Sequence, residues 1–109
     1  MKTIVIIAVS LLVTLSFSAR AADVKTNWNN NCAQCHGKNG KADTKMGKQL
    51  SAKDLTDPKV QAAFTDAKAT QSITDGVKEN GKTTMKAFGG KLTADEVKAL
   101  VAYVRTLKK

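Results

Sequence analysis

Both cysteines and the only histidine of this 109-residue chain lie within five consecutive positions, in the stretch Cys32-Ala-Gln-Cys35-His36. Two thiols two residues apart on a helical turn can each reach one of the two vinyl groups on one edge of a porphyrin and form thioethers. The next side chain then points under the ring, where a histidine nitrogen can bind iron. The spacing therefore predicts covalent attachment of c-type haem, with Cys32 and Cys35 as attachment points and His36 as the proximal iron ligand.

Other kinds of site use the same residue types. A thioredoxin-like dithiol follows a buried strand, and no strand pattern precedes Cys32. A zinc site needs four protein ligands, so two cysteines and one histidine leave it incomplete unless carboxylates contribute. Chance proximity of the three residues is a further alternative. We favour haem attachment over all three.

The ligand on the opposite face of the ring decides whether a haem can bind a substrate. His36 is the only histidine, so ligation by two histidines is excluded and the candidates are Met85, Met46 or an open position. Met46 follows His36 so closely that a short loop would have to cross from one face of the ring to the other. Met85 lies within residues 81–90, a segment with turn residues at both ends. We therefore predict Met85 as the distal ligand, with a simple core-filling methionine as the alternative.

The first residues of the chain have the pattern of an export signal. Lys2 supplies a positive start, and the apolar run that follows is shorter than the about 20 apolar residues of a membrane helix. Ala19 and Ala21 form the small-x-small pattern that precedes signal peptidase cleavage. We expect residues 1–21 to be a cleaved secretory signal peptide rather than a retained membrane anchor, and residues 22–109 to be one domain.

This domain is small and strongly basic. Cleavage removes two of the 18 basic residues and none of the 9 acidic ones, which leaves 16 against 9 and a net charge of +7. A chain of this size buries only about 60 to 65% of its surface and often needs a stabilising group beyond its own side chains, such as a disulfide or a bound metal. Haem would fill the core of a chain with few aromatic residues, so we expect the haem-free chain to be largely unfolded.

Helical spacing predicts a helix before the motif and a loop after it. Val24, Trp28 and Cys32 fall on one face of a short helix that begins near Asp23. Residues 37–51 are rich in Gly, Lys and Asp and have no period, which indicates a loop.

Three more helices are predicted downstream, and no alternating strand pattern is present. Asp57 followed by proline starts a helix that would run through Val60 and Phe64. A further helix over residues 67–79 stops at an Asn-Gly pair. The capping box Thr93-Ala-Asp-Glu96 starts a last helix whose apolar residues continue almost to the C-terminus. The predicted fold class is therefore all-α.

Several segments match one protein family. The export signal, the Cys-x-x-Cys-His motif, Met85-Lys-Ala-Phe and a last helix containing Leu-Val-Ala-Tyr103-Val-Arg resemble the small, single-haem class I cytochromes c of bacteria. The resemblance covers essentially all of residues 22–109 and implies a periplasmic protein with the cytochrome c fold. In that fold the first and last helices cross and pack together, and Trp28 and Tyr103 are the aromatic candidates for the contact.

Two loops depart from the family pattern. The family often has proline after the ligand methionine, where this chain has Lys86. It also often has a Gly-Pro-x-Leu loop whose backbone carbonyl orients the proximal histidine, and here the loop reads Gly47-Lys-Gln-Leu. Every residue has a carbonyl, so the hydrogen bond to His36 does not require the proline.

Ligation by histidine and methionine implies an electron carrier rather than an enzyme. It leaves no open iron position for a substrate, and a thioether ligand favours ferrous iron. We expect a soluble, monomeric, periplasmic one-electron carrier that holds one haem c, has no small-molecule substrate and shuttles electrons between redox proteins of a respiratory or related chain. A five-coordinate haem that binds a small gas or peroxide, and a tethered cytochrome subunit of a larger oxidoreductase, are the alternatives.

Lysines follow the haem motif and surround Met85. A positive rim around an exposed haem edge would steer the protein toward acidic patches on redox partner proteins, whereas solvated lysines that only keep the protein soluble are the alternative. Neither nucleic acid nor a membrane anchor is an expected partner of this exported domain. The lysines concerned are Lys38, Lys41, Lys45, Lys48, Lys82, Lys86 and Lys91.

Overall fold

The computed structural model describes residues 23–109, so the predicted signal peptide, residues 1–21, lies outside the described residues. Among the described residues, no helix combines the length and the apolar character needed to cross a membrane. The described chain forms six helices and one two-stranded antiparallel hairpin. In chain order the elements are α1 (Val24–Asn31), α2 (Ala33–His36), α3 (Lys45–Gln49), α4 (Pro58–Ala62), α5 (Asp66–Asp75), β1 (Val77–Glu79), β2 (Lys82–Met85) and α6 (Ala94–Thr106).

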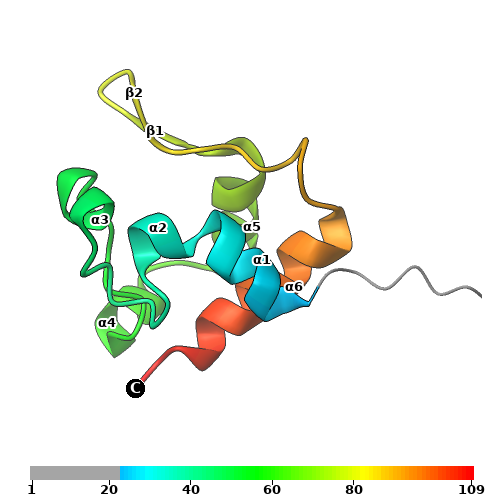
Figure 1. Cartoon of the computed structure of the whole chain (residues 1–109), viewed down its shortest axis with the longest axis horizontal. Coiled ribbons are helices and arrows are strands. Elements are labelled where there is room, and N and C mark those ends of the chain that lie inside the picture. The colour runs from blue at the N-terminus through cyan, green and yellow to red at the C-terminus, as the bar shows by residue number, and fades with distance from the viewer. Residues whose placement is uncertain (1–22) are drawn as a thin grey trace, which may run out of the picture.

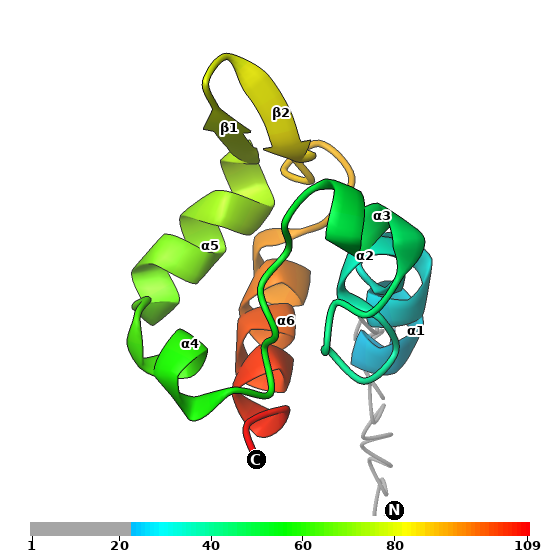
Figure 2. The same cartoon turned by 90° about the vertical axis from the view of Figure 1, so that its left-hand side faces the viewer.

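The first and last helices pack against each other, as Figures 1 and 2 show. Trp28 of α1 is only 2% exposed, and its ring lies 5.3 Å from that of Tyr103 on α6, centroid to centroid, at an interplanar angle of 55°. This tilted geometry is one that aromatic pairs favour. The predicted aromatic contact between the terminal helices is confirmed.

Helix α6 begins at a capping box, in which Thr93 and Glu96 each accept a hydrogen bond from the backbone N–H of the other. The Thr93 hydroxyl accepts the Glu96 N–H, and the Glu96 carboxylate accepts the Thr93 N–H, both at 3.1 Å. The same carboxylate accepts a 2.7 Å hydrogen bond from the Asn27 amide of α1. The capping box thus also ties the two helices together. The buried apolar side chains of α6 are Val97, Leu100, Val101 and Val104.

The segment predicted as a loop, residues 37–51, contains a short helix that the sequence did not predict. Helix α3 begins after Thr44, whose hydroxyl accepts the Gly47 N–H at 2.9 Å. The same hydroxyl donates a 2.9 Å hydrogen bond to the Cys35 carbonyl oxygen. A five-residue helix is too short to show a hydrophobic period, and this one is held by a tertiary contact instead. Helix α4, in contrast, begins at Pro58 as predicted, but it ends at Ala62 and does not continue through Phe64.

The helix predicted over residues 67–79 is shorter in the structure, and two strands that the sequence pattern did not predict follow it. Helix α5 ends at Asp75, where Gly76 adopts a φ of 76°. Strands β1 and β2 then pair around Asn80 and Gly81, whose φ values of 51° and 78° are typical of a type I′ hairpin turn. The hairpin projects from one end of the molecule (Figure 1).

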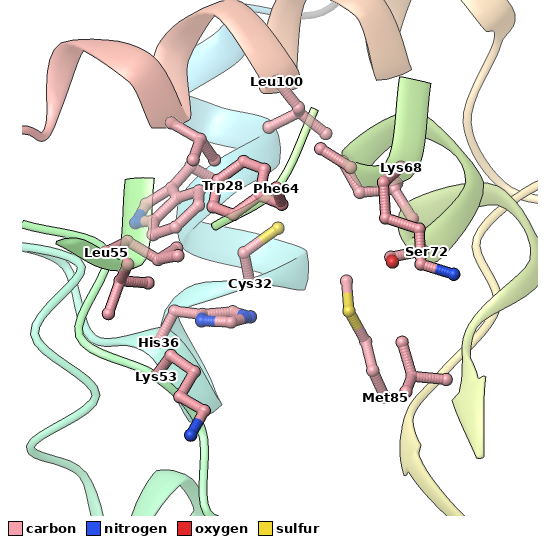
Figure 3. Close-up of a pocket in the computed structure, with 15 residues that line it drawn as sticks. Trp28, Cys32, His36, Lys53, Leu55, Phe64, Lys68, Ser72, Met85 and Leu100 are labelled. Carbon is pink, nitrogen blue, oxygen red and sulfur yellow. The ribbon is translucent and has the colours of Figure 1, made fainter. Parts of the chain in front are cut away.

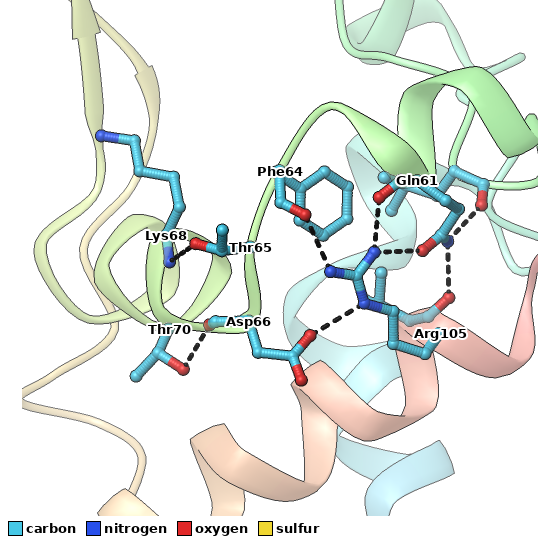
Figure 4. Close-up of polar contacts among 9 residues, drawn as sticks. Gln61, Phe64, Thr65, Asp66, Lys68, Thr70 and Arg105 are labelled. Carbon is cyan, nitrogen blue, oxygen red and sulfur yellow. Dashed lines mark hydrogen bonds and ion pairs between the residues drawn. The ribbon is translucent and has the colours of Figure 1, made fainter.

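A single arginine joins α6 to the connection between α4 and α5 (Figure 4). The guanidinium of Arg105 donates to the Gln61 carbonyl at 2.6 Å, to the Phe64 carbonyl at 2.9 Å and to the Asp66 carboxylate at 2.8 Å. It also lies over the Phe64 ring, 4.3 Å from the centroid. Gln61 is buried and donates in turn to the Val104 carbonyl at 2.9 Å. These bonds fix the connection between α4 and α5, which contributes Phe64 to the lining of an apolar cavity.

Candidate functional site

An apolar cavity of about 230 Å³ opens between the paired terminal helices, α5 and the segment before α4. Cys32, His36 and Met85 line it together (Figure 3), although Met85 is far from the other two in the sequence. Most of the remaining lining is apolar, so water is poorly held there. The apolar lining residues are Trp28, Leu55, Val60, Phe64, Ala69, Ile73, Val77, Leu100 and Val104.

The predicted attachment motif forms one helical turn at the junction of α1 and α2. The Cys32 N–H donates to the Trp28 carbonyl at 2.9 Å, and the His36 N–H donates to the Cys32 carbonyl at 2.9 Å. Both thiols are free; Cys32 is buried at the cavity, and Cys35 is half-buried on the same turn but is not a lining residue. The turn therefore holds two thiols and an imidazole in the order that the motif predicts.

The environment of Cys32 disfavours a redox dithiol. Burial, with a smaller contribution from the neighbouring Cys35, raises the pKa of the Cys32 thiol to about 11. Thiol and disulfide exchange proceeds through the thiolate, which is scarce at neutral pH when the pKa is so high.

The imidazole of His36 lies in an environment that favours its neutral form and leaves one ring nitrogen without a hydrogen bond. Burial lowers its pKa, which favours the uncharged form that binds metals. Its Nδ1 is buried and has no hydrogen-bond partner among residues 23–109. The carbonyl bond that the Gly47 loop could supply is therefore not formed in this structure. The His36 ring instead lies beside Trp28, with centroids 5.8 Å apart, and Trp28 Nε1 donates to the Gly37 carbonyl at 3.0 Å.

The two candidate methionines have different environments. Met85 is the last residue of β2, is half-buried and extends into the cavity from the side opposite His36 (Figure 3). Met46 lies on α3, is 37% exposed and lines a separate pocket with Gln34. The structure thus brings Met85 and His36 to one cavity and leaves Met46 outside it.

The end of α5 holds residues 85–89 (the Met85 segment) in place. The Phe88 N–H donates to the Ile73 carbonyl at 2.8 Å, and the Gly89 N–H donates to the Thr74 carbonyl at 3.0 Å. A Cβ atom at Gly76 would lie 2.6 Å from the Met85 carbonyl oxygen, so this glycine permits the close approach.

A family model described as cytochrome c oxidase, cbb3-type, subunit III matches residues 19–104, which is most of the chain. The chain belongs to this cytochrome family. A cytochrome c domain carries electrons and is not by itself an enzyme.

Individual relatives agree with this assignment. The cytochrome is 40% identical over 77 residues to the cbb3-type cytochrome c oxidase subunit FixP of Azorhizobium caulinodans. That match covers 71% of this chain but 24% of FixP, so the chain spans about a quarter of that relative's length. Among solved structures, the KustC0563 c-type cytochrome has a TM-score of 0.71 and 37% identity, over 80% of this chain and 99% of the other. A point mutant of the same cytochrome, with one tyrosine changed to phenylalanine, has a TM-score of 0.68 and 36% identity, over 79% and 99%. The predicted cytochrome c fold is confirmed.

The residues present suit the cofactor of this family, which is covalently bound haem c with its iron. A neutral imidazole with an unpartnered buried nitrogen, a thioether and a buried thiol line one apolar space. Imidazole and thioether are both established axial ligands of cytochromes c. Among the described residues, no cluster of three or more His, Cys, Asp or Glu side chains offers a competing metal site.

Three close contacts that support the site were not identified from the sequence. Thr44 and Gly47 hold α3 against the attachment turn, and Gly76 holds the Met85 segment against α5. Gly76 follows the last residue of a helix, a position at which glycine is common, so the sequence did contain a pattern that could have identified it. The role of Thr44 and Gly47 depends on a contact between α3 and the attachment turn and has no local signature.

Proposed function

We propose that Cys32 and Cys35 form the thioether bonds to the haem and that His36 and Met85 are its axial ligands. The observation that carries this proposal is that His36 and Met85, from distant parts of the chain, extend into one apolar cavity beside Cys32. When bound, the haem supplies reversible one-electron oxidation and reduction of its iron. The chain supplies a neutral nitrogen, a sulphur that favours the ferrous state, and a lining that excludes water.

The role we propose is that of a soluble one-electron carrier in the periplasm. Ligands on both faces of the ring leave no iron position for a substrate. The similarity to the KustC0563 c-type cytochrome supports this role, because that solved structure is itself described as a c-type cytochrome.

A second candidate role is that of a cytochrome subunit within a larger oxidase. The match to FixP, which is described as an oxidase subunit, specifically favours it. Purification from the native membrane and soluble fractions separates the two roles. A carrier remains in the soluble fraction after gentle lysis, whereas an oxidase subunit sediments with the membranes and with oxidase activity.

We also propose that lysines steer the carrier to acidic surfaces on its redox partners. Residues 23–109 have 16 basic and 9 acidic residues, and Lys82 and Lys86 flank Met85. Long-range attraction between opposite charges is screened with a Debye length of about 10 Å at 0.1 M salt.

The experiment that tests the carrier role measures electron transfer by stopped flow. The rate constant with an acidic redox protein should fall at least about tenfold between 10 mM and 500 mM salt, because steering raises association rates by 10- to 1000-fold. Carbon monoxide should bind the reduced protein only slowly. Rapid binding of carbon monoxide contradicts the carrier role. An electron-transfer rate constant that does not depend on salt contradicts the steering.

A further inference from the structure

Two lysines reach a cavity whose lining is otherwise largely apolar. Lys53 lies in the segment between α3 and α4, and Lys68 lies on α5. In the described part of the chain, these are the two lining residues with a full positive charge. Figure 3 shows Lys53 on the side of His36 and Lys68 on the side of Met85.

Neither lysine is paired with a carboxylate within residues 23–109. Asp54 follows Lys53 directly, but its carboxylate accepts hydrogen bonds from the N–H and the hydroxyl of Thr56, at 2.9 and 2.6 Å. Lys68 Nζ has a long contact of 3.5 Å with the side-chain oxygen of Gln71. Both ammonium groups therefore remain available to an anion at the cavity.

The cofactor of the family brings its own anions. A haem carries two propionate carboxylates, and removing a carboxylate from water is costly unless hydrogen-bond donors or cations pair with it. Hydrogen bonds from an ammonium group to a carboxylate are about twice as strong as neutral ones. Ser72 lines the same cavity and lies one turn after Lys68 on α5, so an ammonium and a hydroxyl share one face of this helix.

We propose that Lys53 and Lys68 bind the two propionate carboxylates of the haem, with the Ser72 hydroxyl beside Lys68. This inference rests on the proposed haem function and adds the part of the site that recognises the anionic side of the cofactor. Because a positive charge near the iron opposes its oxidation, the two lysines also raise the reduction potential of the protein.

The test compares glutamine variants of the haem-loaded protein. Lys53→Gln and Lys68→Gln should each lower the ratio of reduced to oxidised protein, at a fixed solution potential and low salt, by about threefold to tenfold. Lys98→Gln is the matched control, because Lys98 is exposed on α6 and is not a lining residue. It should change the ratio by less than about twofold. Lys53→Arg and Lys68→Arg should retain the wild-type ratio, because they keep the charge.

A second readout distinguishes the pairing from a general charge effect. In both glutamine variants, but not in Lys98→Gln, the pH at which carboxylate protonation alters the ratio should rise. Each variant is first shown to hold thioether-linked haem by its pyridine haemochrome spectrum. Wild-type behaviour of both glutamine variants with haem attached overturns the inference alone, whereas a wild-type protein without thioether-linked haem overturns the proposed function itself.

A third readout needs no variant. In the wild-type holoprotein, an amine-acetylating reagent followed by mass spectrometry should modify Lys53 and Lys68 at least about threefold more slowly than Lys98, because a salt-bridged ammonium is a poor nucleophile. Equal rates of modification at the three lysines contradict the proposal.

Discussion

At the scale of single residues, Gly47 leaves no room for a side chain beside the attachment turn. The N–H of Gly47 donates to the Thr44 hydroxyl, which donates in turn to the Cys35 carbonyl. A Cβ atom at position 47 would overlap the Cys35 carbonyl oxygen and lie 2.9 Å from that of Ala42. The turn that carries Cys35 and His36 therefore depends on a neighbour without a side chain.

We predict that Gly47→Ala destabilises the haem-loaded protein. Overpacking against backbone costs about 1–3 kcal/mol, which exceeds the gain of up to about 1 kcal/mol that alanine brings to a helix. The free energy of unfolding is measured by guanidinium titration of the ferric protein. Gly90→Ala is the control, because nothing lies within 4 Å of a Cβ at that position. Equal stability of the two variants would show that α3 is not pressed against the attachment turn.

The site residues that could be predicted from the sequence are those whose pattern lies within a short stretch of chain. The roles expected of Cys32, Cys35 and His36 could be inferred from their spacing alone, because one helical turn positions all three. Choosing Met85 over Met46 required only an estimate of loop lengths, and the structure places Met85 at the cavity. The lysines of the cavity could not be found in this way, because two separate elements bring them to it.

At the scale of elements, helices with strong caps were predicted well and weakly specified segments were not. Helix α6 begins at its capping box, whereas α3 has a structure that depends on the attachment turn. The Asn80-Gly81 pair is compatible with both a helix stop and a hairpin turn. The hairpin forms because α5 has already ended at Gly76, where the backbone meets the Met85 segment. That contact is tertiary, so the sequence pattern alone did not reveal it.

We predict that Arg105→Lys weakens the junction of α4, α5 and α6. A lysine cannot donate at once to the Gln61 and Phe64 carbonyls and the Asp66 carboxylate, because it lacks the planar fork of a guanidinium. These part-buried carbonyls, left without donors, should cost roughly 1–3 kcal/mol, measured by chemical denaturation. Asp66→Asn, which removes only the exposed ion pair, should cost less than about 1 kcal/mol. A larger loss in Asp66→Asn than in Arg105→Lys would refute this account.

At the scale of the whole molecule, the apolar cavity lies at the centre of the fold. Helices α1 and α6 form one wall, and α5 with the segment before α4 forms another. A small domain whose walls face a space rather than each other buries less apolar surface on folding. Filling that space should therefore contribute a large part of the stability.

We predict that the chain does not fold without haem. The double variant Cys32→Ala/Cys35→Ala, produced without haem, should lack native near-UV circular dichroism and unfold without a cooperative transition. Gln34→Ala changes one of the two residues between the cysteines, keeps both thiols and should retain haem and the native spectrum. A cooperative transition in the haem-free double variant would mean that the side chains alone form a sufficient core.

The central claim is that His36 and Met85 hold the iron from opposite faces. Absorption spectroscopy of the ferric protein tests it directly, through the weak charge-transfer band of an iron–sulphur bond. The account predicts that wild type and Met46→Ala show this band and that Met85→Ala loses it, with thioether-linked haem retained in all three. Persistence of the band in Met85→Ala, or its loss in Met46→Ala, would contradict the account.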